Sequence, residues 1–295
     1  MTEQIWNSQE ELKQYIREEM ESQKDLHDNE LFKHALRQCT DDEFLYLVAE
    51  NAPHLIIEEI AASGIRSKEY RYAMICSNLR GRYALIHDLA VNRELDEQTA
   101  KRILLVDDWE ENKNDAMHVI NDEALLMLAC LKSFSLRAAA VRRLKEIGSP
   151  YPDRYYSELG QEEKESIRME WFRKACADAE QLLETDQKMD QALSDQVEII
   201  SDMLIGFLAA CHPVPEKRIF YAEQTTSETI AAYAGSVTEY DDVRSILSAK
   251  IHREDLIDLL SFPYSFDEEP FLIPDTEEKR SAFCHEVFRN RNTAQ

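Results

Sequence analysis

The stretch INDEALLMLACLKSFSLRAAAVRRLKEIG, residues 120–148, holds two apolar helical patterns with only a few residues between them. In the second pattern, Leu136, Ala140, Val141 and Leu144 recur at the three- and four-residue spacing of one helix face. Two such patterns in succession predict a pair of α-helices that pack against each other.

The composition of the chain also favours helices. The 295 residues include only 6 glycines and 8 prolines, so tight turns between strands are scarce. Hydrophobic residues make up 44% of the chain, which is too apolar for a disordered protein. No segment shows the alternation of apolar and polar residues that is typical of strands. The sequence therefore predicts an all-α protein.

Three segments of the N-terminal half can be aligned with one another: FLYLVAEN at 44–51, LIHDLAVN at 85–92 and ALLMLACL at 124–131. The alignment places Ala49, Ala90 and Ala129 in one column, 41 and 39 residues apart. A small residue after a large apolar one allows two helices to approach closely. A period near 40 residues is typical of two-helix repeats.

The second helix of the 120–148 stretch resembles that of HEAT-type repeats. The resemblance rests on Leu136, Arg137, Ala140, Val141, Leu144 and Ile147. It covers residues 40–148 and implies an α-solenoid in which Arg137 starts the helix and bonds to a ladder of acidic side chains. The chain departs from the family at Ser133 and Ser135, which stand where an aspartate is usual.

The predicted architecture is a HEAT-like helical-repeat stack followed by a C-terminal helical bundle. Residues 1–148 form the stack, with an N-terminal capping helix that starts at the capping-box pattern Ser8 to Glu11. The same pattern at Thr40 and Glu43 predicts another helix start. The turn-rich segment 148–160, with two prolines and two glycines, marks the boundary.

Residues 149–295 form the predicted bundle. Apolar residues recur at helical spacing over 167–182 and over 193–211, which predicts two long helices. Shorter helices follow up to residue 260, and a final helix is expected from Glu277 to Phe288. Between them lies an arm, residues 261–275, rich in aromatic residues and proline. The arm is either an exposed docking peptide or, as is more common, a segment that folds back and covers an open end of the helices.

The charge of the chain limits its partners. It carries 34 Lys and Arg against 58 Asp and Glu, a formal net charge of −24. A field of that sign repels phosphate backbones and anionic lipids, so we expect no nucleic-acid or membrane partner. No run of 18 apolar residues or leader pattern is present, and the six scattered cysteines are typical of reduced, buried thiols, so a cytoplasmic protein is expected.

Catalytic and metal-binding motifs are absent from the sequence. It contains no glycine-rich phosphate loop, no nucleophile elbow and no zinc-protease motif. The adjacent pairs Cys211-His212 and Cys284-His285 fit a zinc site poorly, because neighbouring residues on a helix point in different directions. We therefore expect no metal, no cofactor and no enzymatic activity.

Basic residues cluster in two places of this acidic chain. Residues 66–82 contain Arg66, Arg71, Arg80 and Arg82, and the second helix of the 120–148 stretch contains Arg137 and Arg142. These six arginines could line a groove that binds an acidic or phosphorylated peptide. In the alternative interpretation they pair with acidic neighbours such as 107–112 and hold helices together, which is the more common role of surface charges.

Three functions compete. The first is a non-catalytic adaptor that binds a peptide or helix of another protein on an extended helical surface. The second is a neutralising protein, of the antitoxin or immunity type, whose acidic surface binds a basic enzyme. The third is a helical enzyme whose active site is assembled from distant residues.

Overall fold

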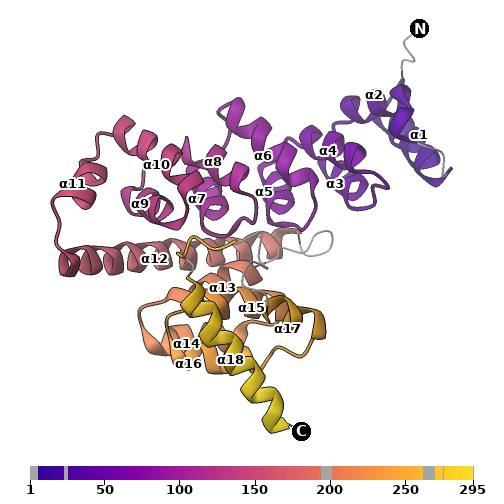
Figure 1. Ribbon diagram of the computed structural model, residues 1–295. Helices are drawn as coiled ribbons and strands as arrows, with labels where there is room; N and C mark the ends of the chain where they lie inside the picture. Colours follow the sequence, from indigo (N-terminus) through magenta and orange to yellow (C-terminus); the bar gives the residue numbers. More distant parts are fainter. Residues whose placement is uncertain (1–5, 23–25, 194–200, 262–269, 275, 295) are drawn as a thin grey trace. The chain divides into compact units, whose positions relative to one another are not determined.

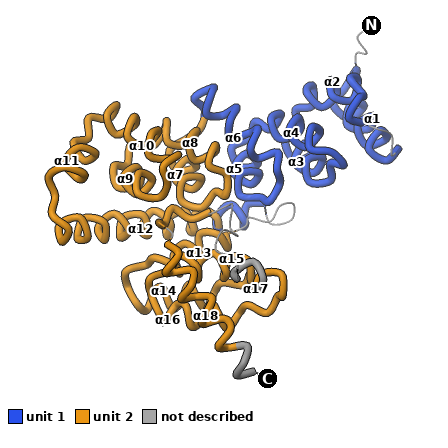
Figure 2. The backbone as a smooth tube through the Cα atoms, viewed as in Figure 1, with its two compact units in different colours: residues 1–94, 187–200 blue, residues 95–186, 201–295 orange. Residues whose placement is uncertain are grey.

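The computed structural model describes residues 6–22, 26–193, 201–261, 270–274 and 276–294 (Figure 1). Within these ranges the protein is α-helical and has no β-strand, which confirms the predicted all-α class. None of the helices in these ranges is both long and apolar enough to cross a membrane. The chain divides into two compact units, residues 1–94 with 187–200 and residues 95–186 with 201–295 (Figure 2).

The helices of the first unit are α1 (Gln9–Glu21), the short 3-10 helix η1 (Leu26–Asp28), α2 (Glu30–Gln38), α3 (Asp42–Glu50), α4 (Leu55–Gly64), α5 (Lys68–Cys76) and α6 (Gly81–Val91). The second unit begins with α7 (Glu97–Val106), α8 (Glu110–Met117), α9 (Glu123–Lys132), α10 (Phe134–Glu146) and α11 (Tyr151–Ser157). It continues with α13 (Asp202–Cys211), α14 (Pro215–Gln224), α15 (Glu228–Val237), α16 (Asp241–Ser248), α17 (Glu254–Ser261) and α18 (Glu277–Ala294). The long helix α12 (Gln161–Leu193) starts in the second unit and ends in the first.

Short polar side chains fix where these helices begin. Ser8 caps α1 as predicted, and its Oγ accepts a hydrogen bond from the Glu11 amide at 3.1 Å. At α3 the cap lies one residue later than predicted, because Asp41 rather than Thr40 accepts from the Phe44 amide, at 3.0 Å. A carboxylate is favoured there since its charge also interacts with the helix dipole.

Consecutive helices pack as pairs joined by short loops (Figure 1). In the first unit these pairs are α3 with α4 and α5 with α6, and α4 also packs on α6. In the second unit they are α7 with α8, α9 with α10, α13 with α14 and α15 with α16. The second helices of neighbouring pairs, α8 with α10 and α14 with α16, lie against each other as well.

The three aligned segments do not hold equivalent places in these pairs. Ala49 and Ala129 lie in α3 and α9, which are the first helices of their pairs, whereas Ala90 lies in α6, a second helix. The separation near 40 residues therefore spans three helices rather than two. Ala49 and Ala129 are buried, whereas Ala90 is partly exposed, so the three alanines do not share one packing environment.

In several places an acidic residue in the first turn of one helix bonds to the backbone at the start of the helix two places later. Asp42 of α3 accepts hydrogen bonds from the backbone N–H groups of residues 66 and 67, at 2.7 and 2.9 Å, just before α5. Glu228 of α15 accepts in the same way from residues 252 and 253, at 2.8 and 2.9 Å, just before α17. The same contact thus recurs in distant parts of the chain.

Helix α12 connects two groups of helices within the second unit. On one side, Asp178 accepts from the Nζ of Lys101 in α7 at 2.9 Å, and Lys174 pairs with Asp122 at the start of α9, at 3.0 Å. On the other side, Glu180 pairs with Lys217 of α14 at 2.6 Å. The predicted single helix over 193–211 is instead divided, because Ser201 is the N-cap of a separate α13. Residues 194–200 lie outside the described ranges.

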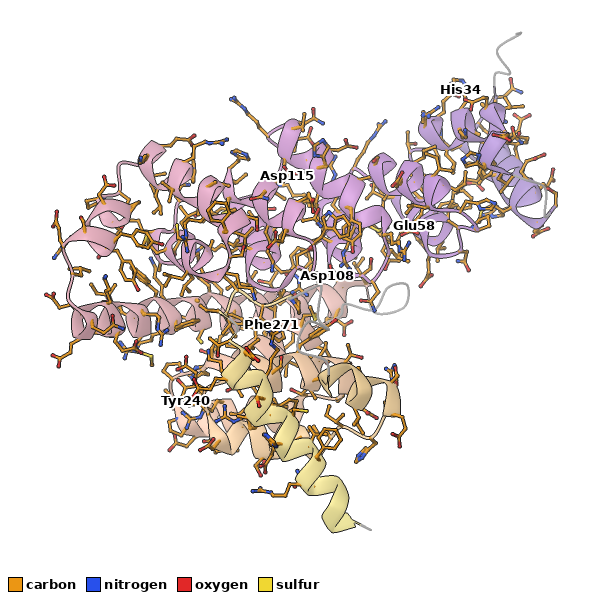
Figure 3. The ribbon with its side chains drawn as sticks, in the orientation of Figure 1. His34, Glu58, Asp108, Asp115, Tyr240 and Phe271 are labelled. Atoms are coloured by element: carbon orange, nitrogen blue, oxygen red, sulfur yellow. The ribbon has the colours of Figure 1, made fainter. Side chains whose placement is uncertain are left out.

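The described part of the arm, 270–274, folds back onto helices of the second unit. The amide of Leu272 donates to the Leu105 carbonyl of α7 at 2.9 Å, and the Nζ of Lys113 in α8 donates to the Pro270 carbonyl at 2.7 Å. Phe271, labelled in Figure 3, is buried with its two successors. This part of the arm therefore belongs to the core; residues 262–269 lie outside the described ranges.

Candidate functional site

The arginines of the 66–82 cluster divide into two kinds. Arg71 and Arg82 take part in contacts inside the first unit. The Nε of Arg71 donates to the Ile65 carbonyl at 2.8 Å, and its Nη1 pairs with Glu94 at 2.9 Å. Arg82 is buried and donates from Nη1 to the Ser77 carbonyl at 2.5 Å. These contacts favour a structural role for both side chains.

Arg66 and Arg80 are exposed instead. Arg66 lines a pocket of about 400 Å³ between α2, α4 and α6. The same pocket is lined by one more arginine, Arg37, and by the two acids Glu59 and Asp88. Each of its two arginines is thus matched by an acid, and no aromatic side chain of the described residues lines this pocket.

Arg137 lies in the first turns of α10 in the second unit. Its Nε donates to the backbone carbonyl of Cys130 in α9, at 3.0 Å, and its guanidinium carbon lies 5.8 Å from the centre of the Tyr156 ring in α11. The expected bond to a ladder of acidic side chains is therefore replaced by a bond to a carbonyl. In the described part of the chain, no carboxylate forms an ion pair with Arg137.

A pocket of about 570 Å³ opens beside this arginine, between α10 and α11. Its lining residues are Arg137, Val141, Pro152, Asp153, Tyr156 and Ser157. We call it the α10–α11 pocket. It combines one cation with an apolar wall and a single carboxylate.

Two features of the sequence position α10: an N-cap residue at its start and a row of apolar residues on its buried face. Ser133 is the N-cap, and its Oγ accepts from the Leu136 amide at 3.2 Å. Leu136, Ala140 and Leu144 recur on one face and are buried. Arg137 directly follows the first of these residues, so it lies at the edge of the buried face and at the rim of the pocket.

Helix α11 supplies the aromatic side of the pocket. Its buried Tyr155 packs against Trp171 of α12, with the ring centres 5.3 Å apart. The neighbouring Tyr156 points about 100° away on the helix and is 46% exposed. Partial burial raises the pKa of the Tyr156 hydroxyl and the Arg137 charge opposes the rise, so the phenol stays neutral at physiological pH and can donate a hydrogen bond.

The other basic residues of α10 do not line the pocket. Arg142 is exposed and lies outside it. Arg143 donates from Nε to the Ile120 carbonyl at 3.0 Å and from Nη2 to Asn121 Oδ1 at 2.8 Å, which ties α10 to the loop before α9. Of the six predicted arginines, Arg137 is thus the one that both lines a pocket and lies over the ring of an aromatic residue in that pocket, Tyr156.

Sequence reasoning missed Pro152 and Tyr156. Both belong to the segment 148–160, which the sequence marks only as a domain boundary because of its prolines and glycines. Residue 148 lies inside the second unit, since α11 packs on α9 and α10. The aromatic run at residues 155 and 156 was the available signal, because one ring can pack inward while the next faces solvent.

The pair Cys211-His212 has a structural environment. The Cys211 thiol is buried, donates to the Phe207 carbonyl at 3.2 Å and lies 3.7 Å from the Cys176 sulfur. His212 is the C-cap of α13, and its Nδ1 accepts from the Val214 amide at 3.1 Å. No group of three potential metal ligands occurs within the ranges that the structure describes.

Comparisons of the chain with protein families, with curated proteins and with solved structures gave no match. The α10–α11 pocket is therefore the feature of the protein that bears on its function.

Proposed function

We propose that this protein is a non-catalytic adaptor that binds an anionic segment of another protein at the α10–α11 pocket. The observation that carries the proposal is Arg137, a cation held over an aromatic ring, beside a pocket, with no ion-pair partner among the described residues. An arginine fixed in this way presents its remaining N–H groups to a ligand in a geometry that suits carboxylates and phosphates.

The surroundings of Arg137 favour a protein ligand. Phe134, one helical turn before Arg137, is 85% exposed, and Tyr156 is 46% exposed. Aromatic and arginine side chains are the groups that most often dominate protein–protein binding energy. A large apolar ring left in water so close to an available cation supports a surface that a partner covers.

The architecture proposed with this function is an array of stacked helix pairs of the HEAT-like kind. It is supported by the recurring contact between the first-turn acid of one helix and the start of the helix two places later. Glu97 of α7 also accepts in this way, from the Asn121 amide before α9, at 3.2 Å. Because Glu228 makes the equivalent contact, we extend the proposed array to α13–α17, in place of a separate C-terminal bundle.

The neutralising function remains the second proposal, and the net charge of −24 favours it. A basic enzyme would bind the acidic surface rather than the α10–α11 pocket, and its association would weaken strongly with salt. The two proposals therefore differ in their dependence on Arg137, because only the adaptor function requires this side chain for binding. Five cysteines are buried and none in the described ranges forms a disulfide, which supports the further proposal of a reducing, cytoplasmic location.

Substitution of Arg137 separates these proposals. Wild type, Arg137→Gln and the matched control Arg142→Gln, which removes an equal charge from the same helix outside the pocket, are immobilised and exposed to native lysate at low and moderate salt. Quantitative mass spectrometry should find a protein retained by wild type and Arg142→Gln and lost from Arg137→Gln. Identical partners on all three proteins would refute the adaptor proposal, and a basic partner released by moderate salt would favour the neutralising one.

A further inference from the structure

We infer that the ligand of the α10–α11 pocket is the C-terminal residue of a partner chain, with an aliphatic side chain and a free carboxylate. This inference rests on the proposed function and specifies its ligand. Three features of the pocket match three groups that such a residue carries on one Cα atom.

The first feature is the hydrogen-bonding capacity of Arg137. Its Nε is already engaged by the Cys130 carbonyl at 3.0 Å, which fixes the plane of the guanidinium. The N–H groups of Nη1 and Nη2 remain, and together they form the fork that binds both oxygens of one carboxylate. The bond to Cys130 thus orients the fork before any ligand arrives.

The second feature is the charge of the lining. Arg137 is its single cation and Asp153 its single carboxylate. A phosphate group carries close to two negative charges at neutral pH, and a stretch of several acids carries more. Asp153 and a chain of net charge −24 repel a ligand in proportion to its negative charge, so both would be repelled more strongly than a single carboxylate, whose one charge the Arg137 fork can pair. Asp153 can in turn accept the backbone N–H of the same terminal residue.

The third feature is the apolar wall. Val141 lies one helical turn after Arg137, and Pro152 and the Tyr156 ring complete the wall. Side chains one turn apart on a helix have Cβ atoms about 5–6 Å apart. This separation is comparable to the size of a single amino-acid residue. In a C-terminal residue the carboxylate and the side chain are bonded to the same Cα atom, so one group can reach Arg137 and the other Val141. A volume of about 570 Å³ accommodates such a residue and part of the one before it.

Small probes can test the inference by saturation-transfer NMR on the full chain. The terminal-residue probe is N-acetyl-leucine. The comparison probes are N-acetyl-leucinamide, which lacks the carboxylate, N-acetylglutamic acid α-amide, which has only a side-chain carboxylate, and the α-amide of N-acetylphosphoserine. N-acetyl-leucine should bind wild type and Arg142→Gln, and should bind Arg137→Gln about tenfold more weakly because the charged fork is lost.

Two further variants keep the test interpretable. Arg137→Lys retains the charge but not the fork, so its affinity should lie between those of wild type and Arg137→Gln. Val141→Ala shortens the apolar wall and should weaken the binding of N-acetyl-leucine without changing the charge around Arg137. Thermal unfolding of each variant confirms that it is folded before its binding is compared.

The outcomes separate this inference from the proposed function. Equal binding of leucine and leucinamide, stronger binding of the glutamate or phosphoserine probe, or no binding of any probe would each overturn the C-terminal ligand. If a lysate protein is nevertheless lost from Arg137→Gln alone, the adaptor proposal stands with another ligand. If no partner depends on Arg137, the proposed function itself fails.

Discussion

Arg102 of α7 and Asp186 of α12 form an ion pair in which both side chains are buried. Nη1 of Arg102 lies 2.7 Å from Oδ1 and 2.6 Å from Oδ2 of Asp186, and the Ser201 hydroxyl donates to Oδ2 at 3.0 Å. Arg102 is 4% exposed and Asp186 is fully buried. The pair thereby joins three segments of the second unit that are far apart in the sequence.

Removal of one member of this pair should destabilise the protein strongly. Arg102→Met leaves the Asp186 carboxylate buried without its cation, and we expect a loss of about 3–5 kcal/mol in the free energy of unfolding. Chemical denaturation measures this loss. The double variant Arg102→Met with Asp186→Leu should recover most of it, because a buried pair replaced by apolar groups is often close to neutral. A double variant as unstable as the single one would show that the pair itself, and not the orphaned charge, carries the stability.

Gly235 of α15 is required by the close approach of α18. A Cβ atom at this position would lie 2.2 Å from two carbons of the buried Phe283 ring. Gly235→Ala should therefore cost about 1–3 kcal/mol, as expected for overpacking, and should increase amide hydrogen exchange in α18. Gly160→Ala is the matched control, since its Cβ would meet no atom closer than 3.7 Å. Equal stability of the two variants would contradict the predicted packing.

Lys113 should make stability depend on pH in the alkaline range. Burial lowers the pKa of Lys113 to about 7 from its ordinary 10.5, and the nearby Lys132 adds to this effect while Asp107 opposes it. Between these two values the unfolded chain binds a proton that the folded protein does not. The free energy of unfolding should therefore rise with pH through this window, by at most about 1.4 kcal/mol per pH unit.

The variant Lys113→Met isolates this contribution. Unfolding free energies of wild type and variant are measured at intervals from pH 7 to 9.5, where other titrating groups affect both proteins alike. The unfolding free energy of wild type should increase relative to that of the variant as pH rises. Parallel profiles would mean that the lysine titrates equally in the folded and unfolded states.

Glu228 should contribute through its contact with the backbone before α17. The hydrogen bonds from residues 252 and 253 lower the pKa of Glu228 in the folded protein. Its stabilising effect is therefore present above the ordinary pKa of a glutamate and is lost as pH falls through the lower, folded value. Glu228→Gln should reduce the melting temperature at pH 7 and should have little effect at pH 3.

The control for this change is Glu216→Gln. Glu216 occupies the first turn of α14 but is exposed and accepts no hydrogen bond within the described ranges. The substitution Glu216→Gln should alter the melting temperature at pH 7 much less than Glu228→Gln does. A similar decrease in both variants would assign the effect to the helix dipole instead of the contact between helices.

Local patterns were sufficient to predict many elements of this fold. The stripe Leu136, Ala140 and Leu144 predicted α10 and its buried face, because a helix repeats every 3.6 residues whatever surrounds it. Ser8 predicted the start of α1 for a similar reason, since a cap bonds only to amides in its own first turn. The local pattern could not show that Ala49 and Ala90 occupy different positions in their helix pairs. Both segments have the same helical pattern, although one forms the first helix of a pair and the other forms the second.

The sequence by itself determined the helical class, most helix positions and the excess of negative charge, since these depend on residues close together along the chain or on composition alone. Only the tertiary structure decided which arginines have partners. Arg71 and Arg137 are both basic residues in helices, yet Glu94 neutralises one, whereas a carbonyl and the ring of Tyr156 hold the other. Charge pairing depends on distances between segments, and those distances exist only once the helices have packed.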